Sequence, residues 1–129
     1  MKATKQYLDQ LTYRIIGAAI EVHKEIGPGL LESIYHQCLQ KEFLLRGIKC
    51  ESELRVDVNY KGEKLSTALR CDFLVEDLVV IELKAVDGII PIHEAQLLTY
   101  MKLLKKPQGI LINFNSYNIF HHGQKSYVN

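Results

Sequence analysis

The stretch Ala68-Leu69-Arg70-Cys71-Asp72-Phe73-Leu74-Val75-Glu76-Asp77-Leu78-Val79-Val80-Ile81-Glu82-Leu83-Lys84 decides the fold of this chain. Its alternating apolar pattern and its many β-branched side chains predict a β-hairpin that turns at Glu76-Asp77. One face of the hairpin is predicted to be apolar, with Cys71, Phe73, Val75, Val79, Ile81 and Leu83. The other face carries charges among its apolar residues, with Arg70, Asp72, Leu74, Val80, Glu82 and Lys84.

The length of the loop determines which residues face each other across this hairpin. A loop of Glu76-Asp77 alone would set Asp72 opposite Ile81, whereas the loop Glu76-Asp77-Leu78 sets Asp72 opposite Glu82. Only the longer loop keeps both apolar rows on one side of the sheet, so burial favours it. We expect a type I turn joined to one left-handed residue, which Asp tolerates well. The two carboxylates would then lie ~5 Å apart at Cβ and repel each other. A divalent cation would convert this repulsion into binding.

Length and composition set broad limits on the protein. Its 129 residues suit a single domain over residues 1–129, and a formal net charge of +1 neither requires nor excludes nucleic acid as a partner. No long uncharged stretch could cross a membrane, and we expect no signal peptide and no membrane partner. The 3 cysteines have no metal-ligand spacing, so we expect free thiols in a reducing, cytoplasmic compartment.

Apolar periodicity gives a coarse order of elements. Helical spacing predicts helices over residues 7–26, 30–46 and 93–105, and Gly27-Pro28-Gly29 separates the first two. Strand patterns cover residues 48–60, 63–69 and 109–114, besides the hairpin. The predicted order is α-α-β-β-β-α-β, a mixed α/β architecture. The second helix is expected to bury Leu31, Ile34, Cys38 and Leu45. The segment from residue 115 onward is expected to be irregular or loosely attached.

Four separated blocks of the sequence resemble one known family. Gly29-Leu30-Leu31-Glu32-Ser33-Ile34-Tyr35 fits the GxxExxY signature of a group of small bacterial and archaeal proteins. Residues 16–23, 81–86 and 93–100 also fit, in the same order, so the resemblance covers roughly residues 10–115. That group is similar to a branch of the PD-(D/E)XK nuclease-like superfamily. The resemblance implies a restriction-endonuclease-like core, in which helices flank a mixed β-sheet.

The resemblance also implies roles for individual residues. Asp72 would supply the first acid of the motif, and Glu82 with Lys84 its second half. Gln96 and Tyr100 match the QxxxY motif of the RecB-type exonuclease branch. Cys71 stands where the superfamily's motif has proline, so the sequence departs from the motif at this position.

These residue types suit metal-assisted hydrolysis. Mg²⁺ or Mn²⁺ would bind the Asp72 and Glu82 carboxylates, and the Leu83 carbonyl could add a third oxygen. A bound ion would lower the pKa of water and neutralise charge on the scissile phosphate. Lys84 would orient the attacking water or stabilise the phosphate. Glu32 would reach the metal directly or through water. Alternatively, Glu32 is an acid favoured by the helix dipole.

The remaining candidates also have structural interpretations. His93, Gln96 and Tyr100 share one stripe of a helix, which could line the cleft or form an amphipathic boundary. Tyr35 is expected to be a core aromatic residue, and His23 an interface residue. The pair at residues 121–122, both histidine, lacks companion ligands.

The sequence therefore predicts a metal-dependent nuclease that hydrolyses phosphodiester bonds, with DNA as the expected substrate. The main alternative is a catalytically silent module of the same fold that binds nucleic acid or a protein partner. A third is hydrolysis of a small phosphorylated compound. A chain this short has little surface with which to hold duplex DNA, which favours a homodimer or a larger partner.

Overall fold

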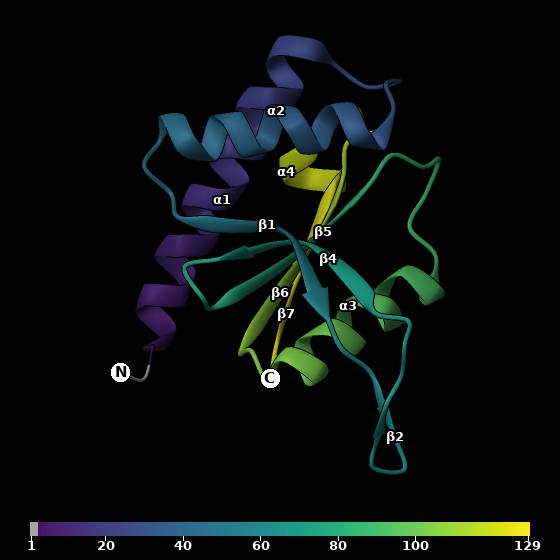
Figure 1. Cartoon of the computed structure of the whole chain (residues 1–129). Coiled ribbons are helices and arrows are strands. Elements are labelled where there is room, and N and C mark those ends of the chain that lie inside the picture. The colour runs from purple at the N-terminus through teal and green to yellow at the C-terminus, as the bar shows by residue number, and fades with distance from the viewer. Residues whose placement is uncertain (1–2) are drawn as a thin grey trace.

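A mixed sheet of five strands, in the order β1-β4-β5-β6-β7, forms the centre of the computed structural model, which describes residues 3–129 (Figure 1). The strands are β1 (Cys50–Val56), β4 (Leu69–Val75), β5 (Val79–Lys84), β6 (Gln108–Asn113) and β7 (Gln124–Val128). Among these five strands, β5 and β6 pair in parallel, the other neighbours pair antiparallel, and α3 (Pro91–Leu104) connects β5 to β6. The predicted mixed α/β architecture is confirmed.

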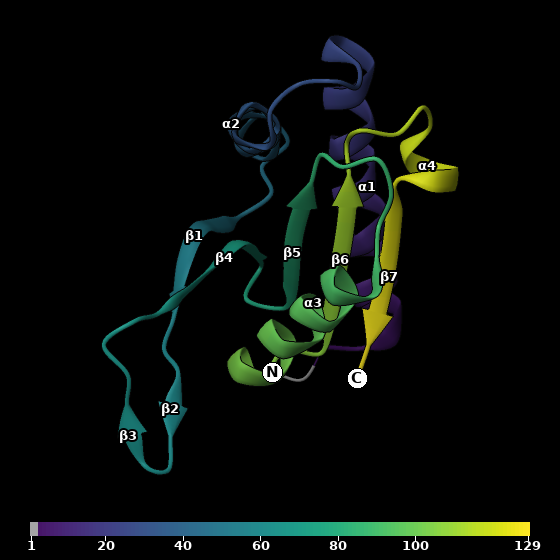
Figure 2. The ribbon, with the colours of Figure 1, turned by 90° about the vertical axis from the view of Figure 1, so that its right-hand side faces the viewer.

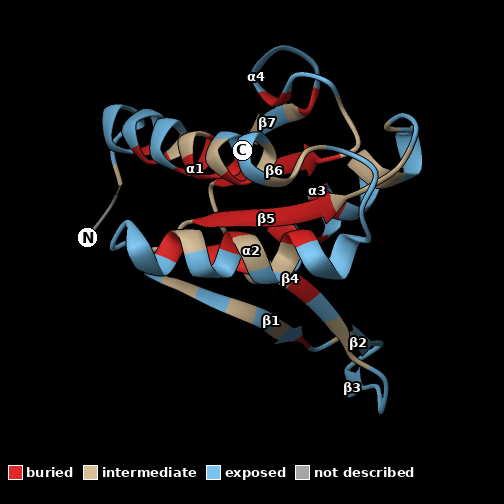
Figure 3. Ribbon diagram, turned by 90° about the horizontal axis from the view of Figure 1, so that it is seen from above, coloured by how far each residue is buried: buried red, intermediate tan, exposed pale blue. Residues whose placement is uncertain are grey.

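Helices cover both faces of the sheet, and each face has its own apolar cluster. The helices α1 (Lys5–Ile26) and α2 (Glu32–Leu45) lie on one side and α3 on the other (Figure 2). Phe73, Val75 and Ile81 belong to the first cluster, whereas Leu74 and Val80 pack with the helix α3 in the second. Strand β5 is consequently buried on both faces (Figure 3), which explains why its charged face is also rich in apolar residues.

The hairpin between β4 and β5 has the predicted loop but a different turn. Val75 pairs with Val79, so the longer loop and its register are confirmed. Both Glu76 and Asp77 are left-handed, with φ of 53° and 59°, and the Leu78 N–H donates to the Val75 carbonyl at 2.9 Å. This is a type I′ turn, not the expected type I turn with one left-handed residue. Type I′ prevails because its twist matches that of the flanking strands.

The expected apolar face of the hairpin is interrupted at Cys71. Phe73 faces α1 and α2, but Cys71 is buried in the cluster on the α3 side. Between them, Asp72 forms no regular bridge with either neighbouring strand, and Glu53 across from it on β1 has a φ of 52°. This local irregularity breaks the alternation of faces, so the assignment of Cys71 to the Phe73 face was wrong.

The buried stripe of α2 also differs from the prediction. Its buried residues are Tyr35, Leu39 and Phe43. Of the residues predicted to be buried, Leu31, Ile34 and Leu45 are exposed and Cys38 is half-buried. Two large aromatic rings set the buried face, because they remove more apolar surface from water than the aliphatic side chains beside them.

The chain after residue 114 is integrated into the fold, so the expectation of a loose tail was wrong. Strand β7 pairs with β6, and the short helix α4 (Ile119–His122) buries Ile119 in the larger cluster. The structure also contains a separate two-stranded ribbon, β2 (Asn59–Tyr60) and β3 (Glu63–Lys64), which extends away from the sheet (Figure 2). Within residues 3–129, no helix is long and apolar enough to span a bilayer.

Tyr35 fixes the connection between α1 and α2. Its hydroxyl donates to the Gly27 carbonyl at 2.6 Å and accepts from the Leu30 N–H at 3.2 Å. Its ring stacks on Phe114 with centroids 4.5 Å apart. Gly27 has a φ of 68°, which favours glycine at this helix end. The tyrosine therefore determines where the first turn of α2 begins.

We expect Tyr35→Phe to lower the free energy of unfolding by about 1 kcal/mol, because it leaves a carbonyl and an N–H without their partner. Urea denaturation followed by circular dichroism measures this change. Tyr13→Phe is the matched control, because Tyr13 is 80% exposed, and it should change nothing. Equal effects in the two variants would show that the Tyr35 hydroxyl does not hold the connection.

Candidate active site

Asp72 and Glu82 lie together at the point where β4 and β5 separate. Regular pairing of these strands ends at Phe73 and Ile81. Beyond it, the Asp72 N–H donates to Glu82 Oε1 at 3.0 Å, and the Leu83 N–H donates to Asp72 Oδ2 at 2.8 Å. Each carboxylate thus takes the place of a backbone carbonyl. These bonds fix one oxygen of each acid. Leu83 contacts the acid pair through its backbone N–H.

Glu82 is a buried acid with a strongly altered affinity for protons. Only 5% of the residue is exposed. Burial raises the pKa of Glu82 to about 8, with the negative charge of Asp72 as the second cause. The Asp72 N–H and the Lys84 ammonium act in the opposite direction without cancelling the shift. The two carboxylates are therefore close enough to repel each other, as the hairpin register predicted.

The Lys84 ammonium forms no ion pair with Asp72 or Glu82 in the described chain. It donates to Gln96 Oε1 at 3.3 Å. Among residues 3–129, neither Asp72 nor Glu82 forms a salt bridge with a lysine or arginine; the His36 ring lies beside the pair, with Nδ1 3.8 Å from Asp72 Oδ1. Within the described part of the chain, no lysine or arginine is therefore ion-paired to either acid.

Glu32 approaches the acid pair from the first turn of α2. Burial raises the pKa of the Glu32 carboxyl, and the charge of Asp72 raises it further. The charges of Lys84, His36 and His93 have the opposite effect. The structure thus places Glu32 near Asp72 and also at a helix N-terminus, so the two interpretations of this residue are compatible.

Helix α3 brings two of the predicted residues to the other side of the pair. Gln96 contacts Lys84, as described. Tyr100 is 4% exposed, and burial together with the charge of Glu82 raises its pKa to about 12. His93 has a local role, because its Nδ1 accepts the Ile90 N–H at 3.2 Å in the first turn of the helix.

Comparison with known proteins agrees with this geometry. A family model described as the PD-(D/E)XK nuclease superfamily matches residues 9–125. The chain belongs to this superfamily. No curated protein matches it. The crystal structure of SSO0001 has a similar fold, with 19% sequence identity and a TM-score of 0.54 over 75% of this chain. The present chain spans 49% of that protein's length.

Membership of the PD-(D/E)XK superfamily makes a divalent metal the group to test against this site, because its nucleases generally use one. Among residues 3–129, no three His, Cys, Asp or Glu side chains are grouped so as to hold a metal ion. Mg²⁺ nevertheless binds commonly through one or two carboxylates and several waters. Asp72 is half-buried and Glu82 is buried, and neither has a Lys or Arg partner in the described chain, so the two acids fit this chemistry.

Sequence analysis missed His36 and Ser52. His36 Nε2 lies 2.7 Å from Ser52 Oγ, and the ring stacks on Phe73 at 4.3 Å between centroids. The histidine therefore faces Asp72 from α2 while β1 and β4 hold its ring. Its position one helical turn after Glu32 was the available signal. Ser52 gave none, because it is distant in sequence and lies on another strand.

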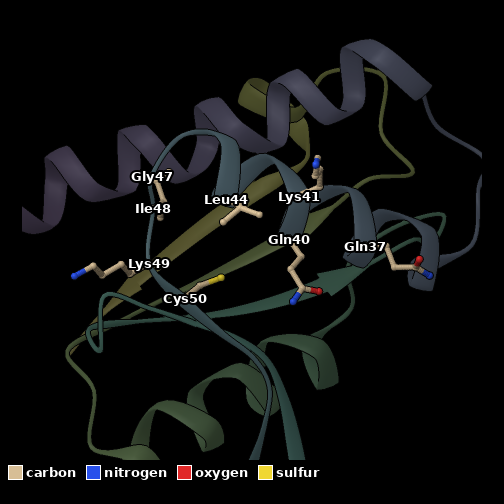
Figure 4. Close-up of a pocket in the computed structure, with 8 residues that line it drawn as sticks. All are labelled: Gln37, Gln40, Lys41, Leu44, Gly47, Ile48, Lys49 and Cys50. Atoms are coloured by element: carbon tan, nitrogen blue, oxygen red, sulfur yellow. The ribbon is translucent and has the colours of Figure 1, made fainter.

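The other candidates lie elsewhere. His23 Nε2 contacts the Ser116 carbonyl at 2.5 Å, consistent with its predicted interface role. The histidines at 121 and 122 are on α4. A pocket of about 780 Å³ beside α2 contains none of the candidate residues (Figure 4). Its lining residues are Gln37, Gln40, Lys41, Leu44, Gly47, Ile48, Lys49 and Cys50.

The altered pKa of Glu82 predicts a specific pH dependence of stability. The folded state retains a proton that the unfolded chain releases above its ordinary pKa of 4.5. The associated stability is therefore complete below that value and is lost as pH rises through about 8. Urea unfolding in metal-free buffer should show the free energy of unfolding falling by at most ~1.4 kcal/mol per pH unit between these two values.

Glu82→Gln should flatten this pH dependence and make the protein more stable than wild type at the alkaline end. The exposed Glu25→Gln serves as the control and should follow the wild-type curve. A Glu82→Gln curve parallel to wild type would show that another group titrates.

Proposed function

We propose that this protein is a metal-dependent nuclease that hydrolyses phosphodiester bonds, with DNA as its substrate. The observation that carries the proposal is the acid pair of half-buried Asp72 and buried Glu82, held by two backbone amides on adjacent strands. Lys84 lies two residues beyond Glu82 on the same strand. Membership of the nuclease superfamily supports the reaction class, although fold alone does not fix an activity.

Asp72 and Glu82 would hold Mg²⁺ or Mn²⁺, with Glu32 contributing directly or through water and the Leu83 carbonyl as a further oxygen. When bound, the cation would acidify water and offset the negative charge of the phosphate. Burial of Glu82 strengthens this role, because the low-dielectric surroundings increase its attraction for a cation.

The polar side chains around the pair would position the reacting groups. The Lys84 ammonium, held by Gln96, would donate to the attacking water or to a phosphate oxygen. Tyr100 keeps its phenolic proton at neutral pH, because its pKa is about 12, and would act as a hydrogen-bond donor. Both groups donate protons in hydrogen bonds and neither needs to remove one.

A catalytically silent module that binds nucleic acid or a protein partner is the second candidate. It is favoured by the hydrogen bonds that already occupy one oxygen of each acid. A cation would then compete with, or rely on, a carboxylate geometry set by the backbone. Metal binding without cleavage would support this candidate.

Mn²⁺ titration calorimetry and plasmid cleavage test the proposal together. Asp72→Asn and Glu82→Gln should lose the Mn²⁺ heat signal and the cleavage. Lys84→Ala should keep Mn²⁺ affinity and lose cleavage by roughly 100-fold or more, because it removes a donor to the transition state. Lys41→Ala, an exposed residue on the far side of α2, is the control and should retain both.

Each result has a distinct meaning. Unchanged cleavage in Lys84→Ala would remove that residue from the mechanism. Absence of Mn²⁺ binding and cleavage by the wild-type protein would refute the nuclease proposal.

A further inference from the structure

A groove of about 300 Å³ lies between the start of β4 and the helix α3. Its lining residues are Leu69, Ile92, His93, Ala95, Gln96, Thr99 and Tyr100. None of them is acidic, so the groove does not add to the negative charge of the acid pair. The first residue comes from the strand that carries Asp72, and the others come from one helix.

The groove is continuous with the candidate active site. Gln96 lines the groove, and its Oε1 also accepts a hydrogen bond from the Lys84 ammonium at 3.3 Å. Tyr100 lines it as well and lies within the electrostatic influence of Glu82. A phosphodiester at the acid pair would therefore have the groove immediately beside it, where the neighbouring nucleoside must go.

The walls of the groove combine apolar surface with a few polar groups. Leu69, Ile92 and Ala95 supply the apolar part, and Ile92 is 65% exposed although it is large and aliphatic. Gln96 and Thr99 supply uncharged donors and acceptors. Apolar walls with few polar groups are typical of small-molecule sites. A nucleobase has the complementary chemistry, with apolar faces and polar edges.

The size and shape of the groove distinguish an unpaired base from a paired one. Its volume is at the lower end of the range for ligand pockets, which suits one nucleoside. In a duplex the faces of each base are covered by its neighbours, and only its edges are accessible. Apolar walls can cover a base face only after the base leaves the stack.

We propose that this groove binds one unstacked nucleobase beside the scissile phosphate, and that the substrate is single-stranded or locally unpaired nucleic acid. The inference rests on the proposed nuclease function and specifies its substrate class. Gln96 acts at both places, because it holds Lys84 and presents its amide to the base edge.

Fluorescence anisotropy tests this with a labelled oligonucleotide as a single strand, as a blunt duplex, and as an abasic strand with the same backbone, all in Ca²⁺ buffer. Wild type should bind the single strand at least ~10-fold more tightly than the other two, because only a strand with an accessible base can cover the apolar walls of the groove. Gel analysis of the same samples shows whether the strands remain intact.

Two variants alter the groove from exposed positions. Ala95→Leu fills it without adding an aromatic ring, and Ile92→Ala removes one wall. Both should weaken single-strand binding about tenfold and abolish the difference between the normal and abasic strands. Gln10→Leu, an exposed position on α1, is the control. Mn²⁺ affinity should be unchanged in all three. If Ala95→Leu does not fold, Ile92→Ala decides the result.

Equal affinity for duplex and single strand, or unchanged binding by the groove variants, would overturn the inference. If Mn²⁺ binding and duplex cleavage persist in that case, the nuclease proposal stands and only the groove assignment fails. Loss of nucleic acid binding together with an absent Mn²⁺ signal in wild type would overturn both.

Discussion

The reciprocal bonds between two carboxylates and two backbone amides are the interaction on which the rest of the structure depends. They let Asp72 and Glu82 replace a segment of regular strand pairing, and so place two polar acidic side chains within the sheet. Polar groups are costly to bury, and the apolar clusters on both faces of β5 offset that cost. The site therefore depends on the burial of β5, which is covered on both faces.

The two helices beside the pair are fixed by contacts that have no part in the chemistry. Tyr35 ties the start of α2 to the end of α1, and Pro91 begins α3. Pro91 is suited to this position because its φ is already helical and its missing N–H is not needed. Consequently, the polar groups that approach the acids come from two helices on opposite sides of the sheet.

Local patterns in the sequence were sufficient for the hairpin register and for most of the candidate site. Burial of Val75 against Val79 allowed only one loop length, and that register brings Asp72 to Glu82. The face of Cys71 was not predictable, because it depends on an irregularity shared with a third strand. His36 was missed because its partner Ser52 is remote in sequence, and β7 because a half-exposed edge strand has little apolar signal.

Strand β1 forms one open margin of the sheet, and the left-handed Glu53 disrupts it midway. Its outward residues include Glu51 and Arg55, so a second chain would meet charge and a distorted hydrogen-bonding row. Both properties discourage edge-to-edge polymerisation. Continuation of the sheet from β1 into a second chain is therefore disfavoured, and the irregularity beside Asp72 that shapes the candidate site also protects this margin from fibril-like stacking.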